Sequence, residues 1–485
     1  MSTSAPDVKA NELLRAGRAA EALPFARRAV AQSPVCSPAH GLLATILLRL
    51  GERDEAETVI TRALTSQPGS ADAYDALAFV SFELGEYERA NALYRRAVEC
   101  APEDPRFWYN LATSERSFGR LSEAEAACGR AIELNQHHYQ SYLLRSELRT
   151  QVDARNHVEA MERLLADPAA TDRARIFLGY ALGKELDDMG HYDRAFQWFT
   201  DAAKTRRRHL QYDVRVDEKK LSRIMEVFPG PKSTAGSRDA DLPGFIFIVG
   251  LPRSGTTLLE RILTRLSGVV SNGETENFSR ALFAEASTQG LDAFARAAAA
   301  NFDGVGRGYV KLASHSARVK VIEKLPLNYL YLGAIRCALP AASAILLNRE
   351  PVDICFAMFR TLFGEAYPFT YDFTDLARYY AAYGRLISHW RTVLGNWLIE
   401  TTYEKLVSQP AQEGATIARA SRLDWDPSAI EIHRSGGVSM TASASQIRRQ
   451  IYQSSAGKWR HYRRHLTPLI AALRSQGVAM PDIDS

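Results

Sequence analysis

The stretch FIFIVGLPRSGTT, residues 245–257, decides how the second half of this chain folds. Its first five residues are apolar and rich in β-forming side chains, which predicts a buried strand of a parallel sheet. A glycine-rich turn follows at once, and Leu258, Leu259 and Ile262 then recur at helical spacing. Strand, turn and helix together direct backbone N–H groups and a helix N-terminus at one point, so the segment predicts a phosphate cradle.

The turn nearly fits the nucleotide-binding pattern GxxxxGK[ST]. Gly250 and Gly255 occupy the two glycine positions and Thr257 supplies the hydroxyl, but Thr256 stands where the lysine should be. No later strand predicted from the sequence ends in an obvious metal-holding aspartate. A nucleotide triphosphatase would therefore lack its main charge for the γ-phosphate and its Mg²⁺. A kinase-like P-loop enzyme stays as an alternative, against which Thr256 argues.

The run PRSGTT after a strand resembles the 5′-phosphosulfate loop of sulfotransferases, with Arg253 as its cation. The similarity is greatest to the protein-tyrosine sulfotransferases and their bacterial repeat-containing relatives, over about residues 243–470. The resemblance implies an α/β P-loop-like domain with a parallel sheet, PAPS as the sulfate donor, PAP as the product, and no metal. It also implies donor-binding residues in the loop: Pro252, Arg253, Ser254, Gly255, Thr256 and Thr257.

Two later runs match the segments that carry the family's catalytic residues. NGETE resembles the segment in which a catalytic glutamate directly follows a glycine, which implies Glu274 as the base and Glu276 as its substitute. EKLP resembles the segment with an active-site lysine, here Lys324. Glu274 would take the proton of an acceptor hydroxyl. Lys324 and Arg253 would stabilise charge on the sulfuryl group and on the leaving phosphate oxygen.

Further along, AILL predicts a second buried strand, and NREPVD begins a helix like the family's 3′-phosphate motif, with Arg349 as the ligand. The serine usual about two turns later is replaced by Ala357, which removes one hydrogen bond unless another donor compensates. A later arginine of that helix is matched approximately by Arg360. The other implied donor contacts are Tyr403, Ser443, Gln446 and Lys458.

The first half of the chain repeats itself every 34 residues. One glycine series, three alanine series and one proline series keep this step, the glycines being Gly17, Gly51, Gly85 and Gly119. Small alanines let two antiparallel helices approach, glycine ends the first helix, and proline ends the second. These units resemble tetratricopeptide repeats over about residues 8–140, an all-α solenoid in which neighbouring units bury each other's apolar faces.

We therefore expect four segments. Residues 1–140 form the repeats, and residues 141–227 form irregular helices that continue or cap the array. Residues 228–244, FPGPKSTAGSRDADLPG, are rich in Pro, Gly and Ser and predict a linker. Residues 245–485 form the sulfotransferase domain.

Composition sets further bounds. A formal net charge of +4 is too small to imply nucleic acid. The aromatics of the basic run KWRHYRR, residues 458–464, fit nucleotide stacking as well as they fit a nucleic-acid patch.

Five cysteines without a CxxC pair predict a reduced, cytoplasmic protein. The first ten residues show no signal peptide, and the apolar run at residues 245–251 is far below the roughly 20 residues of a membrane span.

The repeat pattern predicts an N-terminal tetratricopeptide solenoid, and the family resemblance implies that it is joined to a sulfotransferase that moves a sulfuryl group from PAPS to a hydroxyl. The acceptor stays open, because tyrosine in a protein or peptide held by the repeats, a sugar and a small phenol all offer the same group. The repeats are equally compatible with a spacer or a dimerisation element. A repeat scaffold with an inactive transferase domain is a further alternative, supported by Ala357 alone.

Overall fold

The computed structural model describes residues 5–33, 37–230, 244–286, 292–313, 319–432, 451 and 455–480. These residues form two compact units, which divide between Thr150 and Gln151. We call them the repeat unit, residues 5–150, and the sheet unit, residues 151–480. Throughout the described residues, no helix is long and apolar enough to cross a membrane.

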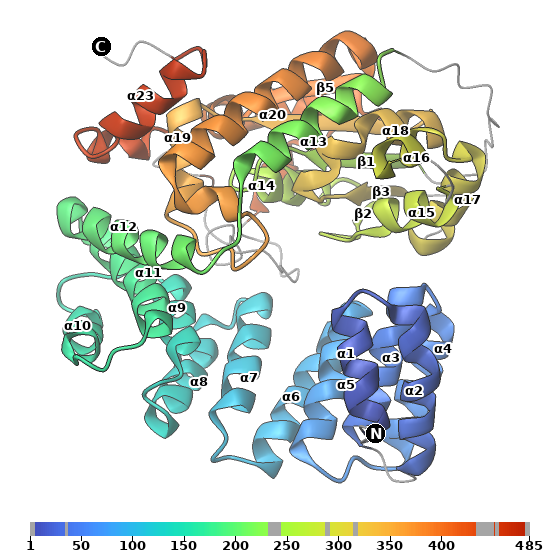
Figure 1. Cartoon of the computed structure of the whole chain (residues 1–485), viewed down its shortest axis with the longest axis vertical. Helices are drawn as coiled ribbons and strands as arrows, with labels where there is room; N and C mark the ends of the chain where they lie inside the picture. Colours follow the sequence, from blue (N-terminus) through green and yellow to red (C-terminus); the bar gives the residue numbers. More distant parts are fainter. Residues whose placement is uncertain are drawn as a thin grey trace. The chain divides into compact units, whose positions relative to one another are not determined.

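Antiparallel helix pairs build the repeat unit (Figure 1). The helices are α1 (Pro6–Arg15), α2 (Ala19–Gln32), α3 (Pro38–Leu50), α4 (Arg53–Thr65), α5 (Ala71–Glu83), α6 (Tyr87–Cys100), α7 (Pro105–Phe118), α8 (Leu121–Leu134) and α9 (Tyr139–Leu148). The glycines of the series lie one or two residues after the ends of α1, α3, α5 and α7, with φ from +73° to +82°. This left-handed conformation favours glycine, so the predicted helix ends are confirmed. Ala22, Ala56, Ala90 and Ala124 are fully buried.

The sheet unit begins with α10 (Val158–Ala166), α11 (Asp172–Asp188), α12 (Tyr192–Arg208) and α13 (Val214–Val227). The alternating part follows as β1 (Gly244–Val249), α14 (Thr256–Leu263), β2 (Val269–Ser271), α15 (Asn277–Glu285), α16 (Ala293–Ala298), α17 (Phe302–Ala313), β3 (Lys320–Glu323), α18 (Leu332–Ala338), β4 (Ser343–Asn348) and α19 (Pro351–Phe359). It ends with α20 (Phe373–Leu394), β5 (Leu398–Thr402), α21 (Tyr403–Ser408), α22 (Pro410–Ala420) and α23 (Thr467–Ser475).

The five strands form one parallel sheet in the order β2-β3-β1-β4-β5. The predicted strands in FIFIV and AILL are confirmed as β1 and β4, which pair at the centre of the sheet. Because all strands are parallel, their carboxyl ends meet at one edge, where ligands of open α/β sheets bind. The turns that follow β1, β3 and β4 all lie at this edge.

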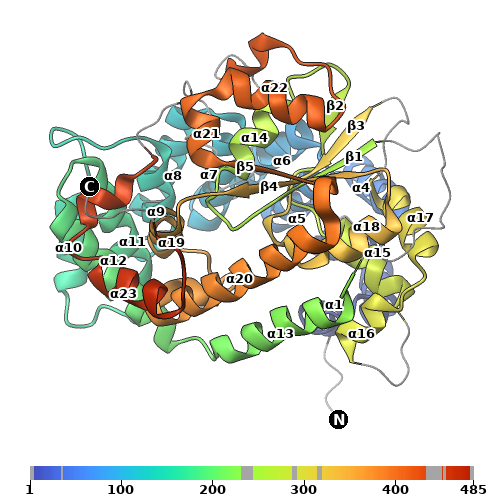
Figure 2. The same ribbon diagram turned by 90° about the horizontal axis from the view of Figure 1, so that it is seen from above.

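Helices cover both faces of the sheet (Figure 2), and alternate residues of β1 face opposite layers. Ile246 and Ile248 of β1 pack with Leu259 of α14 and Ile417 of α22 on one face. On the other face, Phe247 lies in edge-to-face contact with Phe278 of α15, with ring centroids 5.9 Å apart. This period of two explains why β1 is apolar throughout, since both of its faces are covered.

The helices of residues 151–227 belong to the sheet unit, whereas the sequence predicted that they continue or cap the array. Arg378 of α20 donates from Nε to Glu218 of α13 over 2.9 Å. Phe228, the first residue of the predicted linker, is buried against Trp390, with ring centroids 6.2 Å apart. Because α13 packs on α20, which lies far along the chain, composition could not assign this helix. Residues 231–243 lie outside the described residues.

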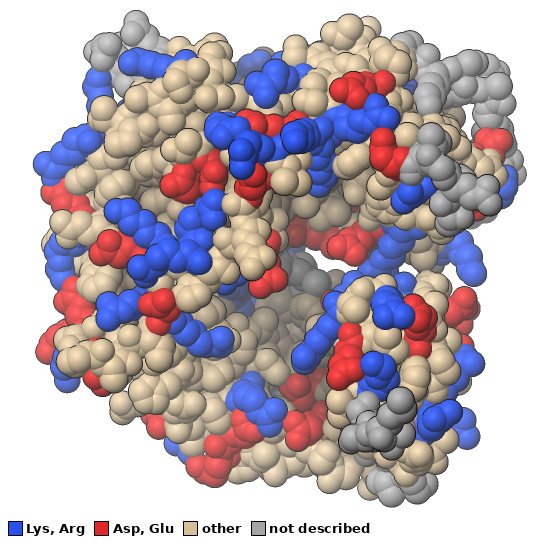
Figure 3. Space-filling model, in the orientation of Figure 1, with Lys and Arg blue, Asp and Glu red and all other residues tan. Residues whose placement is uncertain are grey.

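Charged side chains of both signs are interspersed on the face shown in Figure 3. The described residues form many ion pairs, such as that of Arg207 with Asp375 at 2.9 Å between Nε and Oδ2. This mixture is what a formal net charge of +4 implies.

Candidate active site

The turn after β1 adopts a backbone that its glycines make possible. Gly250 and Gly255 have φ of +153° and +101°. A Cβ at Gly250 would lie 2.6 Å from the Leu347 oxygen, and one at Gly255 would lie 2.5 Å from Tyr403 Cδ2. Arg253 adopts φ of +70° although it has a side chain. The turn is therefore a tight loop that side chains at the glycine positions would disrupt.

The loop ends in buried hydroxyl groups at the N-terminus of α14. Ser254, Thr256 and Thr257 are 1%, 4% and 8% exposed, and Pro252 is also buried. Among the described residues, Ser254 Oγ has no hydrogen-bond partner. A buried hydroxyl without a partner costs free energy, and an oxygen of a bound anion would satisfy it.

Lys324 lies beside this loop, immediately after β3, and its side chain is 0% exposed. Its Nζ donates to Glu274 Oε1 and lies 3.7 Å from Glu260 Oε2. Glu260 comes from α14 and accepts a hydrogen bond of 2.5 Å from Ser271 Oγ. The structure thus brings Glu274 and Lys324 together as an ion pair, and it adds Glu260, which the sequence did not indicate. Glu276 is the N-cap residue of α15, and its Oε2 lies 3.7 Å from Nη2 of Arg280.

Glu323, the last residue of β3, is fully buried next to Lys324. It accepts hydrogen bonds from Thr275 Oγ1 and from the Tyr309 hydroxyl, the latter over 3.1 Å. Burial raises the pKa of Glu323 to about 7, although these bonds and one from Asn272 favour the carboxylate. Sequence reasoning did not single it out, and an acid at the end of an apolar strand was the available signal.

Arg349 ties three segments together at the same edge. Its guanidinium donates to Asp353 Oδ2 over 2.8 and 3.0 Å, to the Arg253 oxygen over 2.9 Å, and to the Ser455 oxygen over 2.6 Å. It also lies over the ring of Tyr403, 4.5 Å from the centroid. The predicted residues Arg253, Arg349 and Tyr403 are thus in contact, and Arg349 is almost fully buried.

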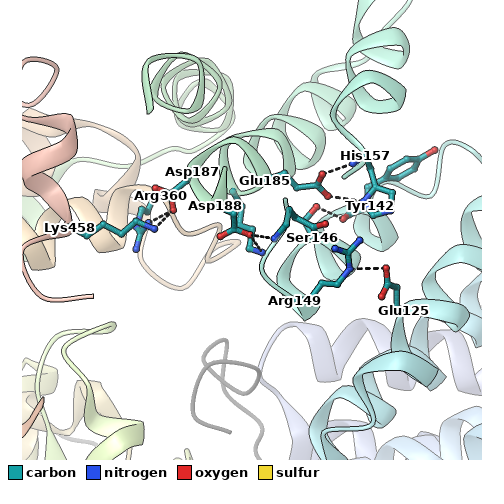
Figure 4. A network of polar contacts seen from close by, with 12 residues as sticks. Glu125, Tyr142, Ser146, Arg149, His157, Glu185, Asp187, Asp188, Arg360 and Lys458 are labelled. Carbon is teal, nitrogen blue, oxygen red and sulfur yellow. Dashed lines mark hydrogen bonds and ion pairs between the residues drawn. The ribbon is translucent and has the colours of Figure 1, made fainter. Parts of the chain in front are cut away.

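Arg360 and Lys458, predicted from separate segments, converge on one carboxylate of α11 (Figure 4). Arg360 Nη1 lies 2.8 Å from Asp187 Oδ2, Lys458 Nζ donates to the same oxygen, and the Tyr462 hydroxyl lies 2.6 Å from Oδ1. Burial alone would raise the pKa of Asp187, but the two cations hold it below its ordinary value.

Sequence reasoning missed Asp187, which lies within the segment of residues 141–227 that was predicted to continue or cap the array. This cluster is linked to Arg349 through Asp353, the carboxylate that Arg349 binds. Gly457, which precedes Lys458, donates from its backbone N to Asp353 Oδ2 over 3.0 Å. Ala357, at the usual serine position, is buried in α19. The predicted contacts Ser443 and Gln446 lie outside the described residues.

A model of the sulfotransferase family matches residues 243–427, and two tetratricopeptide-repeat models match residues 13–78 and 80–138. The chain joins tetratricopeptide repeats to a sulfotransferase-family domain. An uncharacterized protein of Aquifex aeolicus (strain VF5) is 28% identical over 338 residues, which are 65% of this chain and 44% of that protein. The match thus spans less than half the length of this relative.

The sulfotransferase domain is also similar to two solved domains. That of the Synechococcus PCC 7002 olefin synthase is 21% identical and aligns over 51% of this chain and 99% of its own, with a TM-score of 0.36. That of the curacin biosynthetic pathway is 18% identical over 50% of this chain and 100% of its own, with a TM-score of 0.35. For the repeats, pilF of Pseudomonas aeruginosa is 22% identical over 40% of this chain and 87% of its own, with a TM-score of 0.31.

At the sheet edge, this sulfotransferase domain combines a phosphate-type loop, a carboxylate–lysine pair and a buried arginine. Such an arrangement can bind an anionic group, accept a proton and stabilise developing negative charge. The described residues contain no group of three or more His, Cys, Asp or Glu side chains placed to hold a metal ion.

Proposed function

We propose that the sulfotransferase domain moves a sulfuryl group from PAPS to a hydroxyl acceptor. The observation that carries the proposal is the pairing of Glu274 with the buried Lys324 beside the loop. The transfer needs a group that accepts a proton and a cation that stabilises developing negative charge. Thr256 replaces the P-loop lysine of nucleotide triphosphatases, and the buried cation comes instead from the residue after β3.

The loop would hold the 5′-phosphosulfate of the donor. Its backbone N–H groups and the N-terminus of α14 provide donors and a favourable dipole for a phosphate. The unpartnered Ser254 Oγ supports this fit, because a phosphate oxygen would accept its hydrogen bond. Arg253, Thr256 and Thr257 would add side-chain donors from the loop and from the first turn of α14.

Two cationic groups are available for the 3′-phosphate. Within the described residues, the four hydrogen bonds of Arg349 leave one of its five N–H groups for a ligand. Arg360 and Lys458 both pair with Asp187, so these three side chains together carry one positive charge. Tyr403, which packs on Gly255 and Arg349, would lie next to the nucleotide.

When bound, PAPS supplies an activated sulfuryl group. Glu274 accepts the proton of the acceptor hydroxyl while the hydroxyl oxygen bonds to sulfur. The bond between sulfur and the 5′-phosphate oxygen breaks, and PAP leaves with that bond's electron pair. Lys324 and Arg253 stabilise the negative charge on the transferred group and on the leaving oxygen.

A hydroxyl on a large acceptor, with tyrosine in a peptide as the first candidate, fits this site. The Glu274 side chain is 45% exposed, which supports access by a bulky acceptor. The repeats offer a second binding surface on the same chain, which suits a peptide more than a small phenol.

Nucleotide binding tests the donor. PAP at about 100 times its Kd should stabilise the protein by about 2.7 kcal/mol, seen as a rise in Tm. ATP, which lacks the 3′-phosphate, should raise Tm much less. Equal shifts with both nucleotides would refute the donor assignment. Labelled PAPS and a cell lysate would then show which molecule receives the sulfuryl group.

A further inference from the structure

Glu323 sits at the centre of the contacts that hold the Glu274 segment. It is 0% exposed, and it receives hydrogen bonds from the turn after β2 and from α17. The turn contributes Thr275 Oγ1 and the Asn272 side chain, and α17 contributes the Tyr309 hydroxyl. Arg280 of α15 contributes a positive charge that acts on this carboxyl. Burying a carboxylate costs free energy, and a buried polar network whose hydrogen bonds are satisfied makes the surrounding structure rigid.

The backbone fastens the same turn to β3 on both sides of Glu323. Asn272 N donates to the Ile322 oxygen, and Lys324 N donates to the Gly273 oxygen, each over 2.9 Å. Glu274 follows the second of these attachments and precedes Thr275, whose side chain binds Glu323. Both neighbours of Glu274 are therefore held, although its own side chain is 45% exposed.

We propose that Glu323 is a positioning residue for sulfuryl transfer, which holds the turn so that Glu274 meets Lys324. The inference rests on the proposed function, since it assigns Glu323 a role in that reaction. Glu323 itself is enclosed and reaches the site through Thr275 and Asn272 of the turn and through the backbone of Lys324. Misplacing a catalytic group by about 1 Å can cost about 10²-fold in rate.

A pair of isosteric substitutions separates positioning from stability. Thr275→Val removes the hydroxyl that binds Glu323 and keeps the side-chain shape. Thr401→Val is the matched control, because Thr401 on β5 makes the same kind of bond to Glu413 at the far edge of the sheet. Both substitutions should lower Tm by a similar amount. Only Thr275→Val should lower the single-turnover rate of sulfuryl transfer, by about 10- to 10²-fold, with PAP binding unchanged.

Glu323→Gln provides a second readout. Its rate should lose the dependence on pH that ionisation of Glu323 adds to the wild type near neutrality, because the amide does not titrate. Equal rates for Thr275→Val and Thr401→Val, with normal transfer by the wild type, would overturn the positioning role alone. Absence of transfer by the wild type would refute the proposed function, and the positioning role with it.

Discussion

Burying Glu323 makes the stability of the sheet unit depend on pH, and one substitution should remove that dependence. Burial raises the pKa of this carboxyl from 4.5 to about 7. The folded protein therefore holds the proton more tightly than the unfolded chain, and the free energy of unfolding falls as pH rises between these two values. The difference of roughly 2.5 units, at about 1.4 kcal/mol per unit, amounts to about 3 kcal/mol.

Glu323→Gln keeps the shape of the side chain and stays neutral at every pH. We expect the difference in unfolding free energy between variant and wild type to shift by about 3 kcal/mol in favour of the variant from about pH 4 to about pH 8.5. Other titrating groups are common to both proteins, so their contributions cancel in this difference.

Urea unfolding followed by tryptophan fluorescence measures the effect. Five of the six tryptophans report on the sheet unit: Trp198, Trp390, Trp397, Trp425 and Trp459. Glu400→Gln is a useful control on β5, because the hydrogen bond from Arg391 lowers the pKa of Glu400. Its difference from the wild type should move in the opposite direction as pH rises. A constant difference between Glu323→Gln and the wild type would refute the reasoning.

Two further predictions concern the site. Glu274→Gln should lower kcat by about 10²–10⁴-fold and leave PAP binding unchanged. In single-turnover assays Glu276→Gln should have a milder effect. A normal rate for Glu274→Gln together with an inactive Glu276→Gln would show that Glu276, rather than Glu274, is the base. Asp187→Asn should destabilise the sheet unit by about 3–5 kcal/mol, because Arg360 and Lys458 lose their counter-charge. PAP should raise Tm more in this variant than in the wild type, because its 3′-phosphate would replace the lost counter-charge. Equal increases in Tm would show that Arg360 and Lys458 do not bind the donor.

The sequence predicted the elements whose signals are local. The 34-residue period and the glycines that end α1, α3, α5 and α7 depend on short-range steric rules, and the structure confirms them. The loop between β1 and α14 is likewise determined by adjacent residues, and Gly250 and Gly255 have no room for a side chain. Lys324 and Glu274 were singled out by resemblance, and their catalytic roles stay predictions although the structure pairs them.

The helices of residues 151–227 show where local signals were insufficient. Their composition suits helices that cap an array, and nothing in it indicates α20 as the helix on which α13 packs. Phe228 ends α13 in a Pro- and Gly-rich context that predicts a linker, yet it is buried against Trp390. The apolar contact between Phe228 and Trp390, which attaches the end of α13 to α20, joins residues more than 150 positions apart in the chain.

The sequence by itself thus determined the two classes of structure in this protein and the anion-binding turn, because each depends on residues a few positions apart. Only the tertiary structure decided the electrostatics of the site. Asp187 meets Arg360 and Lys458 across 173 and 271 residues, and Glu323 meets Thr275 across 48. Burial and pairing of charge depend on which distant groups share a low-dielectric region, and that is settled only when the chain has packed.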